Sequence, residues 1–171
     1  MTITSPIVVT PFATFSSGVV AGNFTNGEHC QYLHRLNMQF APVETPKSVC
    51  FVCFEEFVGA DECITKLAEI ERRPCEAGAN YLFGYLAEVS EEVMPTALKD
   101  KFLVAAEPGS TICDSSGNQV FLCCRREKNY RVIELASGRK GWAPRWAFLV
   151  EDSTADVLVA VRQTAPVLSR G

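Results

Sequence analysis

The last third of the chain restricts the fold most, because it is a series of short apolar strands separated by polar turns. In Gln119–Cys124, for example, Val120 and Leu122 fall on the same face of an extended chain. Strong turn residues occupy 114–118 and 137–140. The predicted strands are Phe102–Ala106, Gln119–Cys124, Tyr130–Leu135 and Arg145–Val150. Strands this short cannot bury both faces of an open sheet, so we predict that residues 100–151 curl into an antiparallel β-barrel.

The strand and turn residues of this segment follow a recognisable order. An aromatic-rich strand at Tyr130-Arg131-Val132 precedes a turn with Gly138, then Gly141-Trp142-Ala143-Pro144 and a closing strand with Phe148-Leu149. In this order the segment resembles the second half of an SH3 domain, eukaryotic or bacterial. The resemblance implies an SH3-like barrel that contacts partners and does not catalyse.

In that family, aromatic rings and a proline form a groove for a preformed polyproline helix. By this resemblance Pro144 matches the groove proline, and Trp142 is either barrel core or a ligand platform. The partner-binding residues that it implies are Tyr130, Trp142, Pro144 and Trp146. The chain departs from the family at Ala105, Ala106 and Asn129, where tyrosines and the groove tryptophan are expected. Conventional proline-motif binding, another docking mode and a cell-wall or glycan-binding use therefore all stay open.

The first half predicts a small α/β domain over residues 1–95, which makes the whole chain α+β with two domains. Lys47–Phe57 is apolar on both alternating faces, which is typical of a central strand covered on both sides. Asp61 is a plausible N-cap for a helix with Ile64 and Leu67 on its apolar stripe. The aromatic run Asn80–Val89 predicts a second strand. Ser90–Lys101, with a short helical turn from Pro95, forms the expected domain boundary.

The first 27 residues contain no charged side chain, and every charge of the chain lies at or beyond Glu28. Such a leader is poorly solvated by itself, so we expect it to pack on this chain or on another subunit. It forms either edge strands of the N-terminal domain or an arm that adds a strand to a neighbour. The tail, residues 152–171, is compatible with either a capped helix or a strand.

Composition narrows the function classes. The chain is 47% hydrophobic with a net charge of −4, which argues against nucleic acid as the main partner. It has no apolar run long enough for a membrane-spanning helix and no signal-peptide pattern at its start. We therefore expect a cytoplasmic protein whose eight cysteines stay reduced as free thiols.

Cysteine and histidine residues offer one alternative chemistry. Two histidines and the Cys50–Cys53 pair lie within 25 residues, and a zinc ion is usually bound by four such side chains. With Cys30 included, the candidate ligands are His29, Cys30, His34, Cys50 and Cys53. Cys50 and Cys53 lie in a predicted strand, where residues three apart point to opposite faces, so we expect no metal or other cofactor. A Cys–His nucleophile has no recognisable motif, and we assign no catalytic residue.

These observations favour a non-enzymatic protein-interaction or assembly subunit. Its partner is another protein or a second copy of the chain, contacted through the uncharged leader and the barrel. The alternatives are a cysteine- or zinc-dependent enzyme or sensor, and a cell-wall or glycan-binding module.

Overall fold

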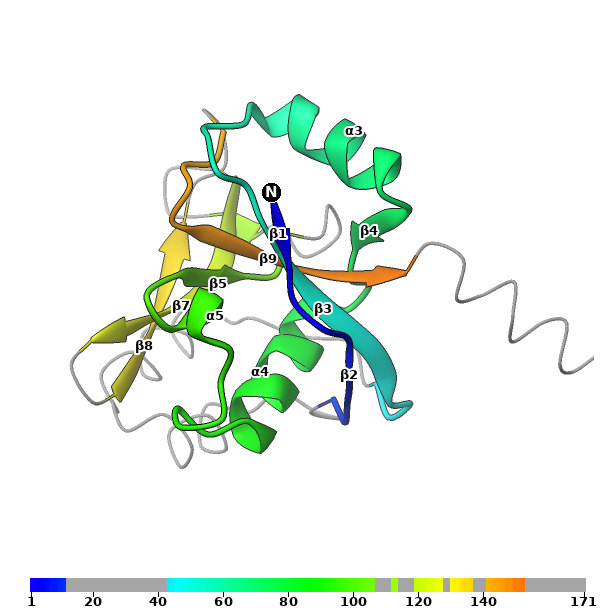
Figure 1. The fold of residues 1–171 in the computed structure, drawn as a ribbon. Helices are drawn as coiled ribbons and strands as arrows, with labels where there is room; N and C mark the ends of the chain where they lie inside the picture. Colours follow the sequence, from blue (N-terminus) through cyan, green and yellow to red (C-terminus); the bar gives the residue numbers. More distant parts are fainter. Residues whose placement is uncertain (12–42, 107–111, 114–118, 128–129, 137–140, 153–171) are drawn as a thin grey trace, which may run out of the picture.

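The fold is a mixed α/β arrangement in which an open sheet carries helices on both faces (Figure 1). The computed structural model describes residues 1–11, 43–106, 112–113, 119–127, 130–136 and 141–152. The strands are β1 (Thr2–Ile3), β2 (Ile7–Val9), β3 (Lys47–Cys53), β4 (Arg72–Pro74), β5 (Phe102–Val104), β6 (Ile112–Cys113), β7 (Gln119–Glu127), β8 (Tyr130–Ala136) and β9 (Trp146–Asp152). The helices are α3 (Ala60–Glu69), α4 (Gly78–Glu88) and α5 (Thr96–Lys99).

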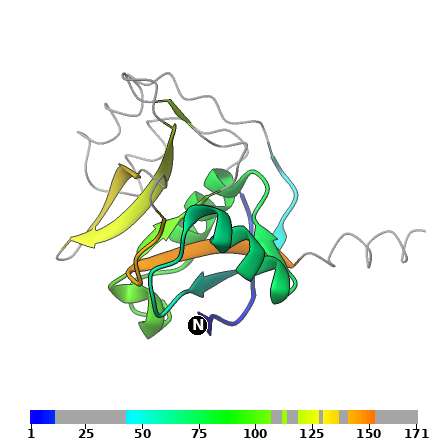
Figure 2. The same ribbon diagram turned by 90° about the horizontal axis from the view of Figure 1, so that it is seen from above.

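The middle of the sheet is the antiparallel pair β3 and β9, in which Val49 faces Glu151 and Cys53 faces Ala147. Strands β1 and β2 pair with the other edge of β3, while β9 pairs in parallel with β5 and antiparallel with β4. From β5 the sheet continues to β7, which pairs with both β8 and β6. The β7–β8 hairpin therefore lies at the end of the sheet away from β1 and β2 (Figure 2).

The predicted strands of the C-terminal third are confirmed, but the described part of the chain does not close them into a separate barrel. β9 pairs along five residues with β3 from the first half, so both halves contribute to one open sheet. The physical reason is that β9 hides its apolar side chains against β3, α3 and α4, which removes the need for residues 100–151 to close on themselves. The SH3-like barrel and the two-domain layout are not confirmed by this pairing.

Both faces of the central strands are covered. On β3, Val49 and Phe51 join the core that includes α4, whereas Cys50 and Val52 join the core that includes α3. Figure 1 shows these two helices on opposite sides of the β3–β9 pair. The prediction of a central strand covered on both sides is confirmed.

Helix α3 is confirmed, but its start and its buried stripe differ from the expectation. Gly59, not Asp61, is the N-cap, and its backbone N–H donates to the Glu62 carboxylate at 3.4 Å. Cys63 and Leu67 form the buried face, while Ile64 is exposed. The predicted stripe was centred one residue too far along, because Cys63 behaves as a small apolar residue.

The predicted strand Asn80–Val89 is wrong, since this segment forms α4. Every residue from Gly78 to Tyr85 is buried, and a helix that is apolar on all sides shows no helical stripe in its sequence. A Cβ on Gly84 would lie 2.1 Å from the carbonyl oxygen of Thr10, so only glycine lets α4 approach β2 this closely.

The start of the leader forms edge strands, as one of the two expectations had it. β1 and β2 are antiparallel to β3, and Val9 is fully buried against α4. The helical turn expected from Pro95 is confirmed as α5. Residues 12–27 of the leader and 153–171 of the tail lie outside the described residues. None of the helices in the described ranges has the length and apolar character needed to cross a membrane.

Candidate functional site

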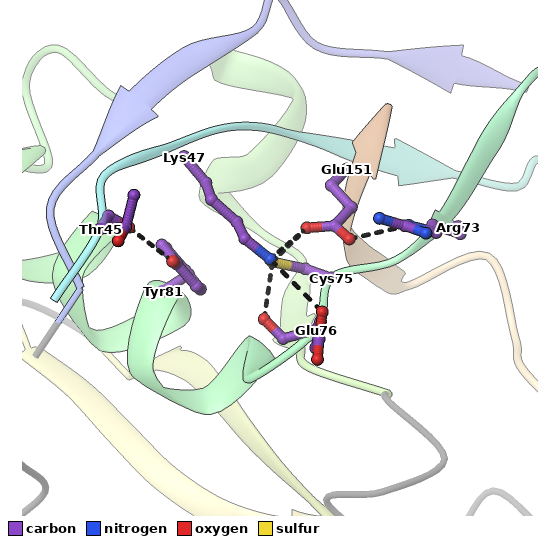
Figure 3. Close-up of polar contacts among 7 residues, drawn as sticks. All are labelled: Thr45, Lys47, Arg73, Cys75, Glu76, Tyr81 and Glu151. Carbon is purple, nitrogen blue, oxygen red and sulfur yellow. Dashed lines mark hydrogen bonds and ion pairs between the residues drawn. The ribbon is translucent and has the colours of Figure 1, made fainter. Parts of the chain in front are cut away.

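The most concentrated polar chemistry in the described residues surrounds Glu151, a carboxylate that is only 4% exposed. Its Oε2 accepts a hydrogen bond from Lys47 Nζ at 2.9 Å, and its Oε1 accepts one from Arg73 Nε at 2.8 Å (Figure 3). Strand register explains the convergence, because Arg73 lies directly opposite Glu151 in the β4–β9 pair. Val49 lies opposite it in the β3–β9 pair, and Lys47 is two residues from Val49 on the same face.

Lys47 has a perturbed protonation equilibrium. Burial acts to lower the pKa of Lys47, but the hydrogen bond and the negative charge of Glu151 outweigh it, so its pKa is raised above the ordinary 10.5. Its ammonium also lies 3.9 Å from the Glu76 carboxylate and 5.3 Å from the centre of the Tyr81 ring. Lys47 is therefore held as a cation between two carboxylates and an aromatic face.

The cysteine beside this cluster is a hydrogen-bond donor. The buried Cys75 thiol lies 3.7 Å from Glu151 Oε2 and 3.6 Å from the backbone carbonyl of Glu76, so its single S–H can donate to either. A nucleophilic cysteine instead needs a thiolate beside a general base. Both histidines of the chain, His29 and His34, lie outside the described residues, so no Cys–His pair is formed within them.

Tyr81 completes the cluster from α4. Its hydroxyl donates to the backbone carbonyl of Thr45 at 2.6 Å, just ahead of β3 (Figure 3). Burial raises the pKa of Tyr81, and the nearby Lys47 partly opposes that effect. We call Lys47, Arg73, Cys75, Tyr81 and Glu151 the Glu151 cluster. Its contacts join β3, β4, β9 and the start of α4, which suits it to holding the sheet together.

Of the candidate zinc ligands, only Cys50 and Cys53 lie in the described part of the chain. Cys50 and Cys53 point into opposite cores, as expected for a strand, so they cannot bind one metal ion together. His29, Cys30 and His34 lie outside the described residues. Within the described ranges, no three side chains of His, Cys, Asp or Glu are placed to hold a metal ion.

The structure brings two of the implied partner-binding residues, Trp142 and Trp146, into contact but buries the first of them. Trp142 is buried, and its ring meets those of Phe148 and Trp146 edge-on at 5.0 and 5.3 Å between centroids. Pro144 is exposed and Trp146 is half-buried. Tyr130 begins β8, but its side chain is outside the described part of the chain. Trp142 thus belongs to the core, whereas Pro144 and Trp146 reach the surface.

Two cations border the surface part of this aromatic group. The exposed guanidinium of Arg145 lies 5.0 Å from the centre of the Phe102 ring and 6.0 Å from that of Trp146. Lys101 Nζ donates to the carbonyl of Pro144 at 2.7 Å. We call Lys101, Phe102, Pro144, Arg145 and Trp146 the Arg145 corner.

A second surface feature lies at the β1–β2 edge of the sheet. The described residues expose seven large apolar side chains, and four of them are on or beside these two strands: Met1, Ile3, Ile7 and Val8. Val8 is 65% exposed. Apolar side chains concentrated on an edge strand are a feature of contact surfaces.

Comparison with known proteins adds no relative. No protein-family model, no curated protein and no solved structure matches the chain. Its function therefore has to be argued from its own residues.

Sequence reasoning missed the Glu151 cluster. Its signal was a carboxylate that directly continues the fully apolar run Ala147–Val150, where the strand is covered on both faces. A charge in such a place requires a partner, since an unpaired buried carboxylate is very costly. Lys47 and Arg73, the two partners, lie 104 and 78 residues away in the chain, so spacing alone does not identify them.

Proposed function

We propose that the protein is a non-enzymatic interaction and assembly subunit, working where its thiols stay reduced. The observation that carries this proposal is the cluster of exposed apolar side chains on the β1–β2 edge. The Glu151 cluster supports a non-enzymatic function, because its ion pairs join strands and its cysteine acts as a hydrogen-bond donor to a carboxylate.

The proposed occupant of the edge is a second copy of the chain. Two identical edge strands can pair antiparallel about a two-fold axis, because the exposed side chains on each face of the edge, such as Val8 on one and Ile7 on the other, then meet their counterparts. Residues 1–11 carry no charged side chain that would repel a second copy or act as a gatekeeper. Pro6 and Pro11 limit β2 to Ile7–Val9, so apolar side chains supply most of the contact and ladder hydrogen bonds supply less.

The test has to leave the fold intact. Deleting residues 1–27 would remove Val9, which is fully buried beside α4, and would expose the core. Val8→Lys instead places a charge on the exposed side of β2, where the monomer tolerates it. Val93→Lys is the matched control, because Val93 is 71% exposed and lies between α4 and α5, outside the strands.

We expect light scattering after size-exclusion chromatography to give the full chain a mass above the 18.8 kDa monomer. Val8→Lys should move it toward the monomer, and Val93→Lys should leave it unchanged. A monomer for all three proteins at every loading would refute self-assembly through this edge.

A further inference from the structure

The Arg145 corner presents a cation whose hydrogen-bond donors are not needed for the packing of the corner. The guanidinium of Arg145 lies over the rings of Phe102 and Trp146 and is exposed. Among the described residues, no carboxylate forms an ion pair with it. Stacking on aromatic rings fixes the plane of a guanidinium and leaves its N–H edge available for a bidentate acceptor.

A second cation, Lys101, is held by the same turn. Lys101 Nζ is bonded to the carbonyl of Pro144, the residue before Arg145, and an ammonium has three donors, so two remain. Both cations are thus tied to the turn at Pro144 and Arg145, on a chain whose net charge is −4. Pro144 and Trp146 add apolar surface directly beside them.

We infer that the Arg145 corner binds an acidic segment of a partner protein. Carboxylates of that segment would bond to Arg145 and to Lys101, while a neighbouring apolar side chain packs on Trp146 and Pro144. The inference deepens the proposed interaction function and rests on it, because it names the chemistry of one partner.

Charge decides which polyanion is favoured. A nucleic acid presents many phosphates and needs an extended basic surface, which a chain with net negative charge and a site of two cations does not offer. An acidic peptide needs only one or two carboxylates at the site. Its apolar side chains also gain from the exposed proline and the half-buried tryptophan.

The experiment is a selection from a random displayed peptide library on the immobilised full-length protein. We expect enriched peptides to combine Asp or Glu with an aromatic residue, leucine or proline. A synthetic copy of the leading peptide is then titrated by fluorescence anisotropy. Arg145→Gln and Lys101→Gln should each weaken the affinity for this peptide about tenfold, which is the effect of losing one charge-assisted hydrogen bond. Arg145→Lys, which keeps the charge without the planar stack, should weaken it less.

Arg126→Gln is the control, because it removes an exposed cation from β7, where its partner is Glu91. It should leave binding unchanged, and each variant is first shown to be folded by its thermal transition. Enrichment of basic or uncharged peptides, no enrichment, or equal binding by Arg145→Gln would overturn the inference. Displacement of the peptide by a short single-stranded oligonucleotide at equal concentration would also overturn it, in favour of phosphate recognition.

The two proposals fail separately. If no peptide binds but Val8→Lys still disrupts the oligomer, only the acidic partner is refuted. Monomers throughout, without peptide binding, refute both.

Discussion

Replacing the buried carboxylate of Glu151 by an amide tests how much the Glu151 cluster holds the sheet together. Glu151→Gln keeps the size of the side chain but removes the negative charge that Lys47 and Arg73 both contact. Lys47 and Arg73 bond to different oxygens of Glu151, so in the variant one cation keeps the amide oxygen and the other faces the amide N–H₂ group. The variant therefore leaves two cations in a partly buried site, where the exposed Glu76 carboxylate, 3.9 Å from Lys47, is the remaining negative charge.

The magnitude follows from the exposure of the three side chains. Removing one partner of a buried ion pair costs about 3–5 kcal/mol when the remaining charge stays buried. Here the side chains of Lys47 and Arg73 are 31% and 41% exposed, so both cations recover part of their hydration. We therefore expect the free energy of unfolding to fall by about 2–3 kcal/mol, below the fully buried case.

Asp152→Asn is the matched control, because it makes the same chemical change at the next residue. Asp152 contacts Arg72 at 3.2 Å but is 43% exposed, and such surface pairs contribute about 0–1 kcal/mol. Urea unfolding followed by tryptophan fluorescence reports on the core through Trp142. A loss for Glu151→Gln no larger than that for Asp152→Asn would refute the reasoning.

Three further predictions concern the thiols, a close packing contact and metal. Burial raises the pKa of Cys63 from its ordinary 9.0 to about 12, so the folded state holds this proton more strongly than the unfolded state. The stability that this gives is present below pH 9 and is lost as the pH rises toward 12, by up to about 1.4 kcal/mol per pH unit. Urea midpoints measured above pH 9 should fall less steeply for Cys63→Ala, and parallel curves would contradict this. Gly84→Ala should lower the free energy of unfolding by about 2 kcal/mol or more, since its Cβ meets the Thr10 carbonyl. Gly59→Ala should cost under about 1 kcal/mol, because its Cβ makes only ordinary contacts with Glu62 at 3.8 Å. Thermal unfolding compares the two glycine variants, and equal losses of stability would count against the close approach of α4 to β2. Elemental analysis of the purified full chain should find no stoichiometric zinc, and one equivalent of zinc would restore the zinc-dependent alternative.

The local sequence pattern was enough to predict the strands whose apolar and polar residues alternate and the helix with a clear apolar stripe. The two-sided apolar run that begins at Lys47 predicted β3, and the turn residues of the last third predicted β7 and β8. The pattern failed for α4, whose residues Gly78–Tyr85 are all buried and so show no polar face. Aromatic composition then favoured a strand, although burial on every side suits a central helix equally well.

The barrel is not confirmed for a different reason. Alternation shows that a strand has faces to bury, but it does not show what covers them. The cover for β9 is β3, and their first paired residues, Val49 and Glu151, are about a hundred positions apart in the sequence. The Glu151 cluster shares this limit, since its residues come together only once β3, β4 and β9 are in register.

Hydrogen–deuterium exchange of the full-length protein, compared at low and high concentration, tests assembly through the β1–β2 edge most directly. We predict slower exchange in peptides from residues 1–11 at high concentration, and no such change in Val8→Lys. Exchange in this segment that is identical at both concentrations, in wild type and variant alike, would contradict the account.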